Sequence, residues 1–112
     1  MNYNNPPKGG TPISSSVMVD TLTVVNDYAK TRPWNDKYQL QVRFKGKFCY
    51  VDAKHSEEDP FPLGRITYFA PNTWAIAFYT YSNERYEPSV YASGEWFGTI
   101  EEAINIFELY LV

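Results

Sequence analysis

The fold of this chain is decided by residues 38–53, which read YQLQVRFKGKFCYVDA. Apolar and polar side chains alternate strictly over residues 38–44, a period of two that is typical of a strand with one buried face. Lys45-Gly46 follows as a two-residue turn, because glycine readily adopts the positive φ angles that tight hairpin turns need. We therefore predict a β-hairpin in which this first strand pairs with residues 48–53.

The position of this turn fixes which side chains of the hairpin share a face. With the turn at Lys45-Gly46, Val42 is expected opposite Cys49 on an apolar face. On the other face, Arg43 is expected opposite Phe48. The whole apolar face comprises Tyr38, Leu40, Val42, Cys49, Val51 and Ala53.

Further strands are predicted at residues 65–70, 73–81 and 85–92, joined by turns at Pro71-Asn72 and Asn83-Glu84. Pro88 lacks a backbone N–H, which places the last of these strands at an edge of the sheet or at a bulge. Residues 54–64 contain acidic groups and two prolines and are read as a loop. Because short turns join antiparallel neighbours, the five strands are expected to form an antiparallel meander.

Helices are expected before and after these strands. Apolar residues recur at helical spacing from about Ser16 to Thr31, and Pro33 prevents this helix from continuing. Near the C-terminus, Thr99 and Glu102 have the spacing of a capping box at the start of a second helix. The predicted fold is therefore α+β with two layers, in the order α-β-β-β-β-β-α, with both helices packed on one face of the sheet.

Length and composition indicate one globular domain. Residues 14–112 of the 112-residue chain are enough for a single hydrophobic core, whereas residues 1–13 are rich in Asn, Pro and Gly and are expected to be a flexible tail. The start of the chain has no signal-peptide pattern, and no apolar run is long enough for a membrane helix. The single cysteine excludes an internal disulfide framework. We expect a cytoplasmic location and no membrane partner.

The charge of the chain argues against a general nucleic-acid binder. The formal net charge is −3, whereas domains that bind nucleic acid are usually basic. The charge is unevenly distributed, because seven basic residues lie between Lys30 and Lys54. This segment is read either as a solvated surface or as a basic patch for an anionic partner.

Aromatic residues are the unusual feature of the composition. They make up 18% of the chain, which is more ring surface than a sheet of this size hides easily. The expected registers give the helix-covered face the side chains of Ile66, Tyr68, Ala75, Ala77, Val90 and Ala92, with Tyr79, Tyr81 and Tyr86 toward its end. The opposite face then carries Arg43, Phe48, Tyr50, Arg65, Phe69, Trp74, Ile76, Phe78 and Tyr91. An uncovered face of this kind is typical of an interaction site.

The leading hypothesis is a non-enzymatic interaction protein that forms a homodimer through this aromatic face, since symmetric pairs are the commonest assemblies. Another protein partner is an alternative. A further alternative is that the N-terminal tail and the 54–64 loop fold over the face and bury it.

Two other classes of function stay open. The first is a small-molecule-binding or enzymatic domain, with a pocket between the aromatic face and the 54–64 loop that is lined by Trp74, Arg65 and His55. The second is single-stranded nucleic-acid binding through the 38–53 hairpin, with charges supplied by Arg43, Lys45 and Lys47.

Catalytic chemistry has no support from the sequence. His55 lies in the acidic segment 52–59, but the spacing of these residues matches no zinc or calcium motif. Cys49 is expected in mid-strand facing the core, where a free cysteine behaves as a small hydrophobic residue. We therefore expect no catalytic residue, no metal ligand and no cofactor.

Overall fold

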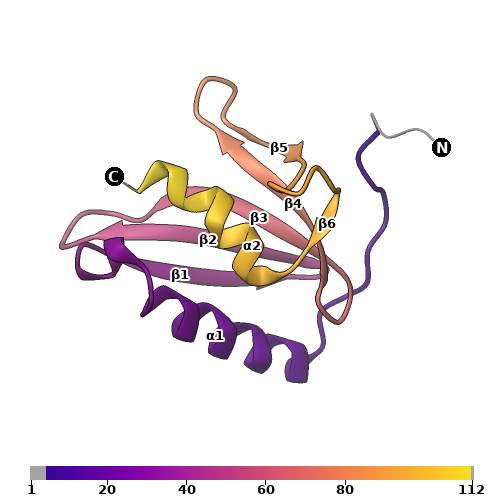
Figure 1. The fold of residues 1–112 in the computed structure, drawn as a ribbon, viewed down its shortest axis with the longest axis horizontal. Helices are drawn as coiled ribbons and strands as arrows, with labels where there is room; N and C mark the ends of the chain where they lie inside the picture. The colour runs from indigo at the N-terminus through magenta and orange to yellow at the C-terminus, as the bar shows by residue number, and fades with distance from the viewer. Residues whose placement is uncertain (1–4, 112) are drawn as a thin grey trace.

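The computed structural model describes residues 5–111 and has an α+β fold (Figure 1). Its helices are α1 (Ser15–Ala29) and α2 (Ile100–Phe107), with short 3-10 helices η1 (Pro33–Asp36) and η2 (Glu108–Tyr110). Its strands are β1 (Tyr38–Lys45), β2 (Phe48–His55), β3 (Phe61–Ala70), β4 (Thr73–Thr80), β5 (Arg85–Ser89) and β6 (Phe97–Gly98). The first five strands form an antiparallel meander in chain order, and β6 pairs with β4. The predicted fold class is confirmed.

Both helices lie on one side of the sheet, where α1 runs along β1, α2 packs against β3 and β4, and the helices contact each other (Figure 1). Their starting points follow from capping residues. The Ser14 hydroxyl accepts a hydrogen bond from the Val17 amide, and Thr99 and Glu102 make the predicted capping box at 3.2 and 2.9 Å. Within the described residues, no helix has the length and apolar character needed to cross a membrane.

The first hairpin forms, but its turn lies one residue later than predicted. The pairing of Lys45 with Phe48 leaves Gly46 and Lys47 as the turn residues. Gly46 has a φ angle of 60°, and glycine with positive φ at the first central position is characteristic of a type II′ turn. Each residue of β1 therefore faces the residue two positions further along β2 than predicted. Because this shift is even, the two faces of the hairpin are as predicted.

The second hairpin contains a β-bulge that the sequence did not predict. Its turn is at Pro71-Asn72, as expected, but beyond the turn Tyr68 pairs with Trp74, so that Phe69 is an extra residue on β3. Proline fixes φ near about −65° and thereby excludes the type I′ turn, whose twist suits a two-residue hairpin. A bulge next to the turn increases the local twist and accommodates the less suitable turn.

This bulge exchanges the two faces of β4. The prediction that Ala75 and Ala77 face the helices is wrong. Trp74 and Ile76 face the helices instead and are almost completely buried, with 2% and 3% of their surface exposed. A single extra residue is sufficient for this exchange, because side chains alternate along a strand with a period of two.

The third hairpin closes through a four-residue loop instead of the predicted Asn83-Glu84 turn. Its last pair is Thr80 with Arg85, because Asn-Glu lacks the glycine that favours a two-residue connection. The strand predicted over residues 85–92 is too long, since β5 ends at residue 89. β5 is an edge strand, in agreement with the position of Pro88.

The hydrophobic core lies between the sheet and the two helices. Its buried members include Val25, Cys49, Val51, Leu63, Ile66, Trp74, Ile76, Ile104 and Phe107. Tyr91 also belongs to this core, although it was expected on the opposite face, and its hydroxyl donates to the Trp74 carbonyl oxygen at 2.8 Å. Gly64 allows this packing, because a Cβ atom at its position would overlap the Phe107 ring and the Ala77 carbonyl oxygen.

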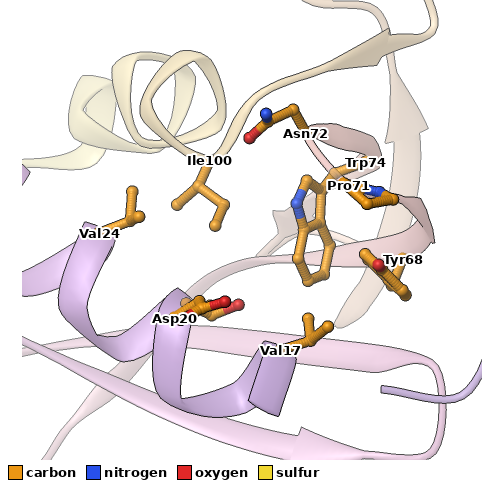
Figure 2. Close-up of a pocket in the computed structure, with 9 residues that line it drawn as sticks. Val17, Asp20, Val24, Tyr68, Pro71, Asn72, Trp74 and Ile100 are labelled. Carbon is orange, nitrogen blue, oxygen red and sulfur yellow. The ribbon is translucent and has the colours of Figure 1, made fainter. Parts of the chain in front are cut away.

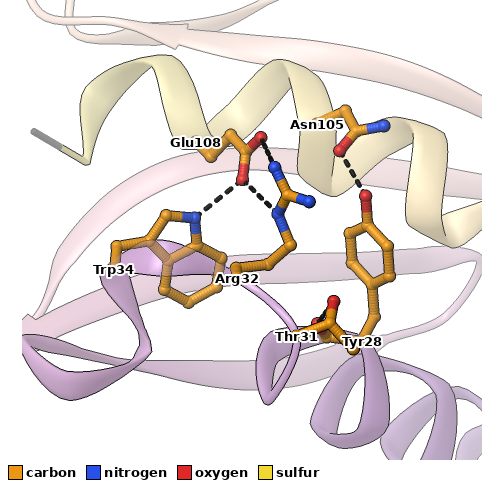
Figure 3. A network of polar contacts seen from close by, with 6 residues as sticks. All are labelled: Tyr28, Thr31, Arg32, Trp34, Asn105 and Glu108. Atoms are coloured by element: carbon orange, nitrogen blue, oxygen red, sulfur yellow. Dashed lines mark hydrogen bonds and ion pairs between the residues drawn. The ribbon is translucent and has the colours of Figure 1, made fainter.

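A polar clamp joins η2 to the segment that follows α1 (Figure 3). The Glu108 carboxylate accepts hydrogen bonds from Arg32 at 2.9 and 2.8 Å and from the Trp34 indole at 2.7 Å. Burial raises the pKa of Glu108, but these hydrogen bonds and the Arg32 charge outweigh it and hold the pKa below its ordinary value. The Tyr28 hydroxyl donates to Asn105 beside this clamp. These contacts fix the two helical segments relative to each other.

Part of the N-terminal segment is attached to the sheet. The Thr11 amide donates to the Tyr68 carbonyl oxygen at 2.7 Å, and the Ile13 amide donates to the Gly46 carbonyl oxygen at 2.9 Å. The Ile13 side chain is buried. Residues 1–4 of the predicted tail lie outside the described residues.

Candidate binding surface

The side of the sheet that points away from the helices is the candidate site, and we call it the outer face. Strand alternation places six large side chains on it: Arg43, Phe48, Tyr50, Arg65, Tyr79 and Tyr86. Arg65 pairs with Ala77, whose small side chain leaves room for its neighbours to lean over it. Ala77 is therefore buried although it lies on the side away from the helices.

The guanidinium group of Arg65 lies between two aromatic rings. Its Cζ atom is 4.2 Å from the centroid of the Phe48 ring and 5.5 Å from that of the Tyr86 ring. Both distances are within the range of cation–π attraction. The Arg65 Nε atom is buried and has no hydrogen-bond partner within the described part of the chain. Aromatic rings, and not a carboxylate, hold this cation in place.

Arg43 combines a ring contact with an ion pair. Its Cζ atom lies 4.9 Å from the centroid of the Tyr50 ring, and its Nε and Nη2 atoms donate to Asp52 at 2.9 and 3.3 Å. Asp52 is only 9% exposed, whereas the Arg43 side chain is 58% exposed. The carboxylate thus orients the guanidinium group while leaving much of it open to solvent.

A row of rings crosses the outer face. The Phe48 and Tyr50 centroids are 6.0 Å apart, those of Tyr50 and Tyr86 are 5.2 Å apart, and those of Tyr86 and Tyr79 are 5.0 Å apart. Burial raises the pKa of the Tyr86 phenol, so this hydroxyl is neutral at physiological pH. The row therefore adds apolar surface and hydroxyl groups without adding negative charge.

Cations dominate the charge of the outer face. In the described strands β1 to β5 and the first hairpin turn, they are Arg43, Lys45, Lys47, Lys54 and Arg65. The Lys47 ammonium nitrogen lies 5.4 Å from the centroid of the Phe48 ring. Within the same segments, Asp52 is the one carboxylate on this face, because Glu87 pairs with Phe78 on the helix side. A chain with a net charge of −3 thus has a positive outer face.

The structure brings together four of the nine residues predicted for this face, namely Arg43, Phe48, Tyr50 and Arg65. Phe69 lies at its margin, on the bulge, with its ring centroid 4.9 Å from that of Phe97. The N-terminal segment passes this margin, because Gly10 adjoins Thr67.

The other four predicted residues do not lie on the outer face. Trp74, Ile76 and Tyr91 are in the core, and Phe78 packs on the helix side with its ring centroid 4.6 Å from that of Tyr110. The assignment of these residues to the face opposite the helices was wrong, because it depended on a second hairpin without a bulge.

Tyr79 and Tyr86 take the place of these residues on the outer face, and their predicted position toward the end of the helix-covered face is wrong. The two tyrosines pair directly across β4 and β5. The one signal that points to them is Pro71, because its fixed φ angle is incompatible with a type I′ turn and favours an irregular hairpin.

The pocket predicted beside the 54–64 loop does not form from its proposed residues. Trp74 is in the core and Arg65 is on the outer face. His55 is at the end of β2, where its Nδ1 atom lies 2.7 Å from a Glu58 carboxylate oxygen. The strands extend into this segment, so only residues 56–60 connect β2 to β3.

The described part of the outer face holds neither a metal-ligand cluster nor a reactive thiol. Among the described residues, no three His, Cys, Asp or Glu side chains gather as metal ligands. Cys49 is buried on the other side of the sheet, and burial raises the pKa of its thiol to about 12, which makes it a poor nucleophile. Cations, aromatic rings and hydrogen-bond donors remain.

Comparisons of the chain with protein-family models, with curated proteins and with solved structures each give no significant match.

Proposed function

We propose that this protein is a non-enzymatic binding protein that holds a single-stranded nucleic acid on its outer face. The observation that carries the proposal is the combination of five cations, a row of rings and one carboxylate on one side of the sheet. Phosphate groups are attracted by Lys and Arg, and unpaired bases stack on aromatic rings and guanidinium planes. A single strand offers both groups at once.

The overall acidity of the chain is compatible with this proposal, because the charge is divided between two sides of the molecule. Electrostatic attraction of a polymer depends on the local field, which is positive over the outer face. The acidic turn at residues 57–59 lies at the end of the β1–β2 hairpin opposite to Gly46. We therefore expect the bound nucleic-acid strand to lie near the Gly46 end of this hairpin, away from residues 57–59.

Self-association through the outer face, the leading hypothesis from the sequence, loses its main argument. It relied on a large exposed apolar area, but Trp74, Ile76 and Tyr91 belong to the core. Two copies joined through this face would also bring two groups of cations together, and like charges across an interface oppose association. An anionic partner fits the charge of the face better than a second copy.

Fluorescence anisotropy with a labelled oligouridylate tests the proposal. We expect binding at low salt, with log affinity falling linearly as log salt concentration rises. The double variant Lys45→Gln/Lys47→Gln is expected to weaken binding and to reduce the salt slope by about 0.7 for each phosphate group that the protein no longer neutralises. The matched control is Lys30→Gln, since this lysine is 73% exposed and lies at the C-terminal end of α1, on the helix side of the sheet; it is expected to bind like the wild type.

An abasic oligonucleotide of equal length separates base recognition from charge alone. Stacking of one base contributes about 1–3 kcal/mol, so the oligouridylate is expected to bind at least about fivefold more tightly. Equal affinity for the two polymers, or no binding at low salt, would contradict the proposal.

A further inference from the structure

A cavity of about 260 Å³ lies on the helix side of the sheet, away from the outer face (Figure 2). It is open to solvent on one side and is lined by α1, by the turn between β3 and β4, and by the start of α2. Val17, Val24 and Ile100 give it apolar walls, and Tyr68 and Trp74 give it an aromatic end. Pockets of this kind, mostly apolar with a few polar groups, are typical of small-molecule sites.

The Trp74 indole presents an unused hydrogen-bond donor to this cavity. The residue is 2% exposed, yet its N–H has no hydrogen-bond partner among the described residues. In Figure 2 the indole nitrogen is on the edge of the ring that faces Val24 and Ile100. The Trp34 N–H, in contrast, donates to Glu108 at 2.7 Å. This N–H is not fully buried, so it can donate to an acceptor that a ligand brings into the cavity.

Thr21, on α1, supplies a second polar group without a hydrogen-bond partner in the described part of the chain. It is 1% exposed and lines the cavity, and its hydroxyl makes no hydrogen bond within residues 5–111. The hydroxyl of Thr23, on the same helix, donates to the Val19 carbonyl oxygen in the usual way. The Thr21 hydroxyl is thus a second polar group, beside the Trp74 N–H, that can form a hydrogen bond with a ligand in the cavity.

The mouth of the cavity carries a carboxylate, whereas the polar groups described so far are neutral. Asp20 lines it, is exposed, and forms no ion pair with a described cation. The Asn72 amide lies on the other side of the mouth, in the turn where its φ angle is 57°. A ligand that fills this cavity is therefore expected to have a cation at its outer end.

We propose that this cavity binds a small hydroxylated aromatic amine. The hydroxyl oxygen accepts a hydrogen bond from the Trp74 indole and contacts the Thr21 hydroxyl. The ring lies between the apolar walls, and the ammonium group pairs with Asp20. This site is independent of the outer face, because its residues belong to the helix side of the sheet.

The experiment uses three probes and the indole N–H signals of the protein in ¹H–¹⁵N correlation spectra. Tyramine has both a phenol and an ammonium group, phenethylamine lacks the phenol oxygen, and 4-ethylphenol lacks the ammonium group. We expect tyramine to shift the Trp74 indole signal, which is assigned by its absence in Trp74→Phe, and to leave the Trp34 signal in place. The two truncated probes are expected to bind more weakly than tyramine.

Variants on α1 test the role of the carboxylate. Asp20→Asn is expected to weaken tyramine binding about threefold to fivefold, as for an exposed ion pair, and to leave 4-ethylphenol binding unchanged. Asp27→Asn is the matched control, since this residue lies on the same helix and pairs with Lys30; it is expected to have no effect. The proposal is overturned if none of the probes moves the Trp74 signal, as for a cavity that holds only water. An equal effect of the two Asp variants would also overturn it.

Discussion

The clamp around Glu108 gives the most detailed prediction about stability. Its carboxylate accepts three hydrogen bonds, at 2.7, 2.8 and 2.9 Å, and its side chain is only 18% exposed (Figure 3). Glu108→Gln removes the charge and places an amide N–H₂ group against the Arg32 donors. Hydrogen bonds to charged groups contribute about 1.5–3 kcal/mol, but the amide oxygen still accepts one bond. We expect the free energy of unfolding to fall by about 1–2 kcal/mol at neutral pH.

The pH dependence of the unfolding free energy tests whether the Glu108 charge is the cause of this decrease. The folded pKa of Glu108 is below the ordinary value of 4.5, so its ionised form stabilises the fold above that pH. This stabilisation disappears as the pH falls through the folded pKa. The difference in unfolding free energy between wild type and Glu108→Gln should therefore narrow in acid.

Urea unfolding followed by circular dichroism, at neutral pH and well below pH 4.5, measures both effects. Glu57→Gln is the control, because Glu57 lies in an exposed turn and should change stability little at either pH. A Glu108→Gln variant as stable as the wild type at neutral pH refutes the reasoning. A difference that stays the same in acid refutes it as well.

Two further predictions concern the core. Gly64→Ala is expected to destabilise the protein by about 2–3 kcal/mol, because the new Cβ overlaps the Phe107 ring and the Ala77 carbonyl oxygen. Gly94→Ala, with a φ angle of 87° but open space around it, should cost only about 1 kcal/mol; equal decreases in stability in urea unfolding would contradict the packing argument. Cys49, with its thiol pKa raised by burial to about 12, should resist iodoacetamide in the folded protein and react after unfolding. Labelling of the native protein at the rate of a free thiol would show that the thiol is not buried.

The sequence was sufficient for the fold class because local signals are strong. Three local signals are followed by the structure: the alternation over residues 38–44, the spacing of Thr99 and Glu102, and the proline after α1. Tertiary contacts did not override them. The turn of the first hairpin lies one residue later than predicted. The predicted assignment of its side chains to the two faces is nevertheless correct, because the resulting shift of register is even.

The second hairpin shows where sequence reasoning ended. The bulge at Phe69 inserts one residue, and an odd insertion exchanges every side chain of the following strand between the faces. Tyr91 was misplaced for another reason, since it leaves the sheet and enters the core by a hydrogen bond to Trp74. Contacts between distant segments, such as Arg32 with Glu108, have no signature in local periodicity. Of the residues predicted for one face, Arg43, Phe48, Tyr50 and Arg65 therefore lie together on the outer face, whereas Tyr79 and Tyr86 were predicted on the other side of the sheet.

The two proposed sites lie on opposite sides of the sheet and differ in chemistry. The outer face is broad, positive and rich in rings, as a polymer would require. The cavity on the helix side is small and mostly apolar, with a carboxylate at its mouth. The NMR signal of the Trp74 indole distinguishes ligand binding at the two sites, because this indole faces the cavity and not the outer face (Figure 2).

Whether the outer face is the binding surface is decided by chemical-shift mapping with a short oligouridylate. We predict that the backbone amide shifts that change on titration cluster on β1, β2 and β3, around Arg43, Tyr50 and Arg65, and that these changes disappear at high salt. Shift changes confined to α1 and α2, with β1 to β3 unaffected, would show that the strand binds elsewhere and that the outer face is not the site.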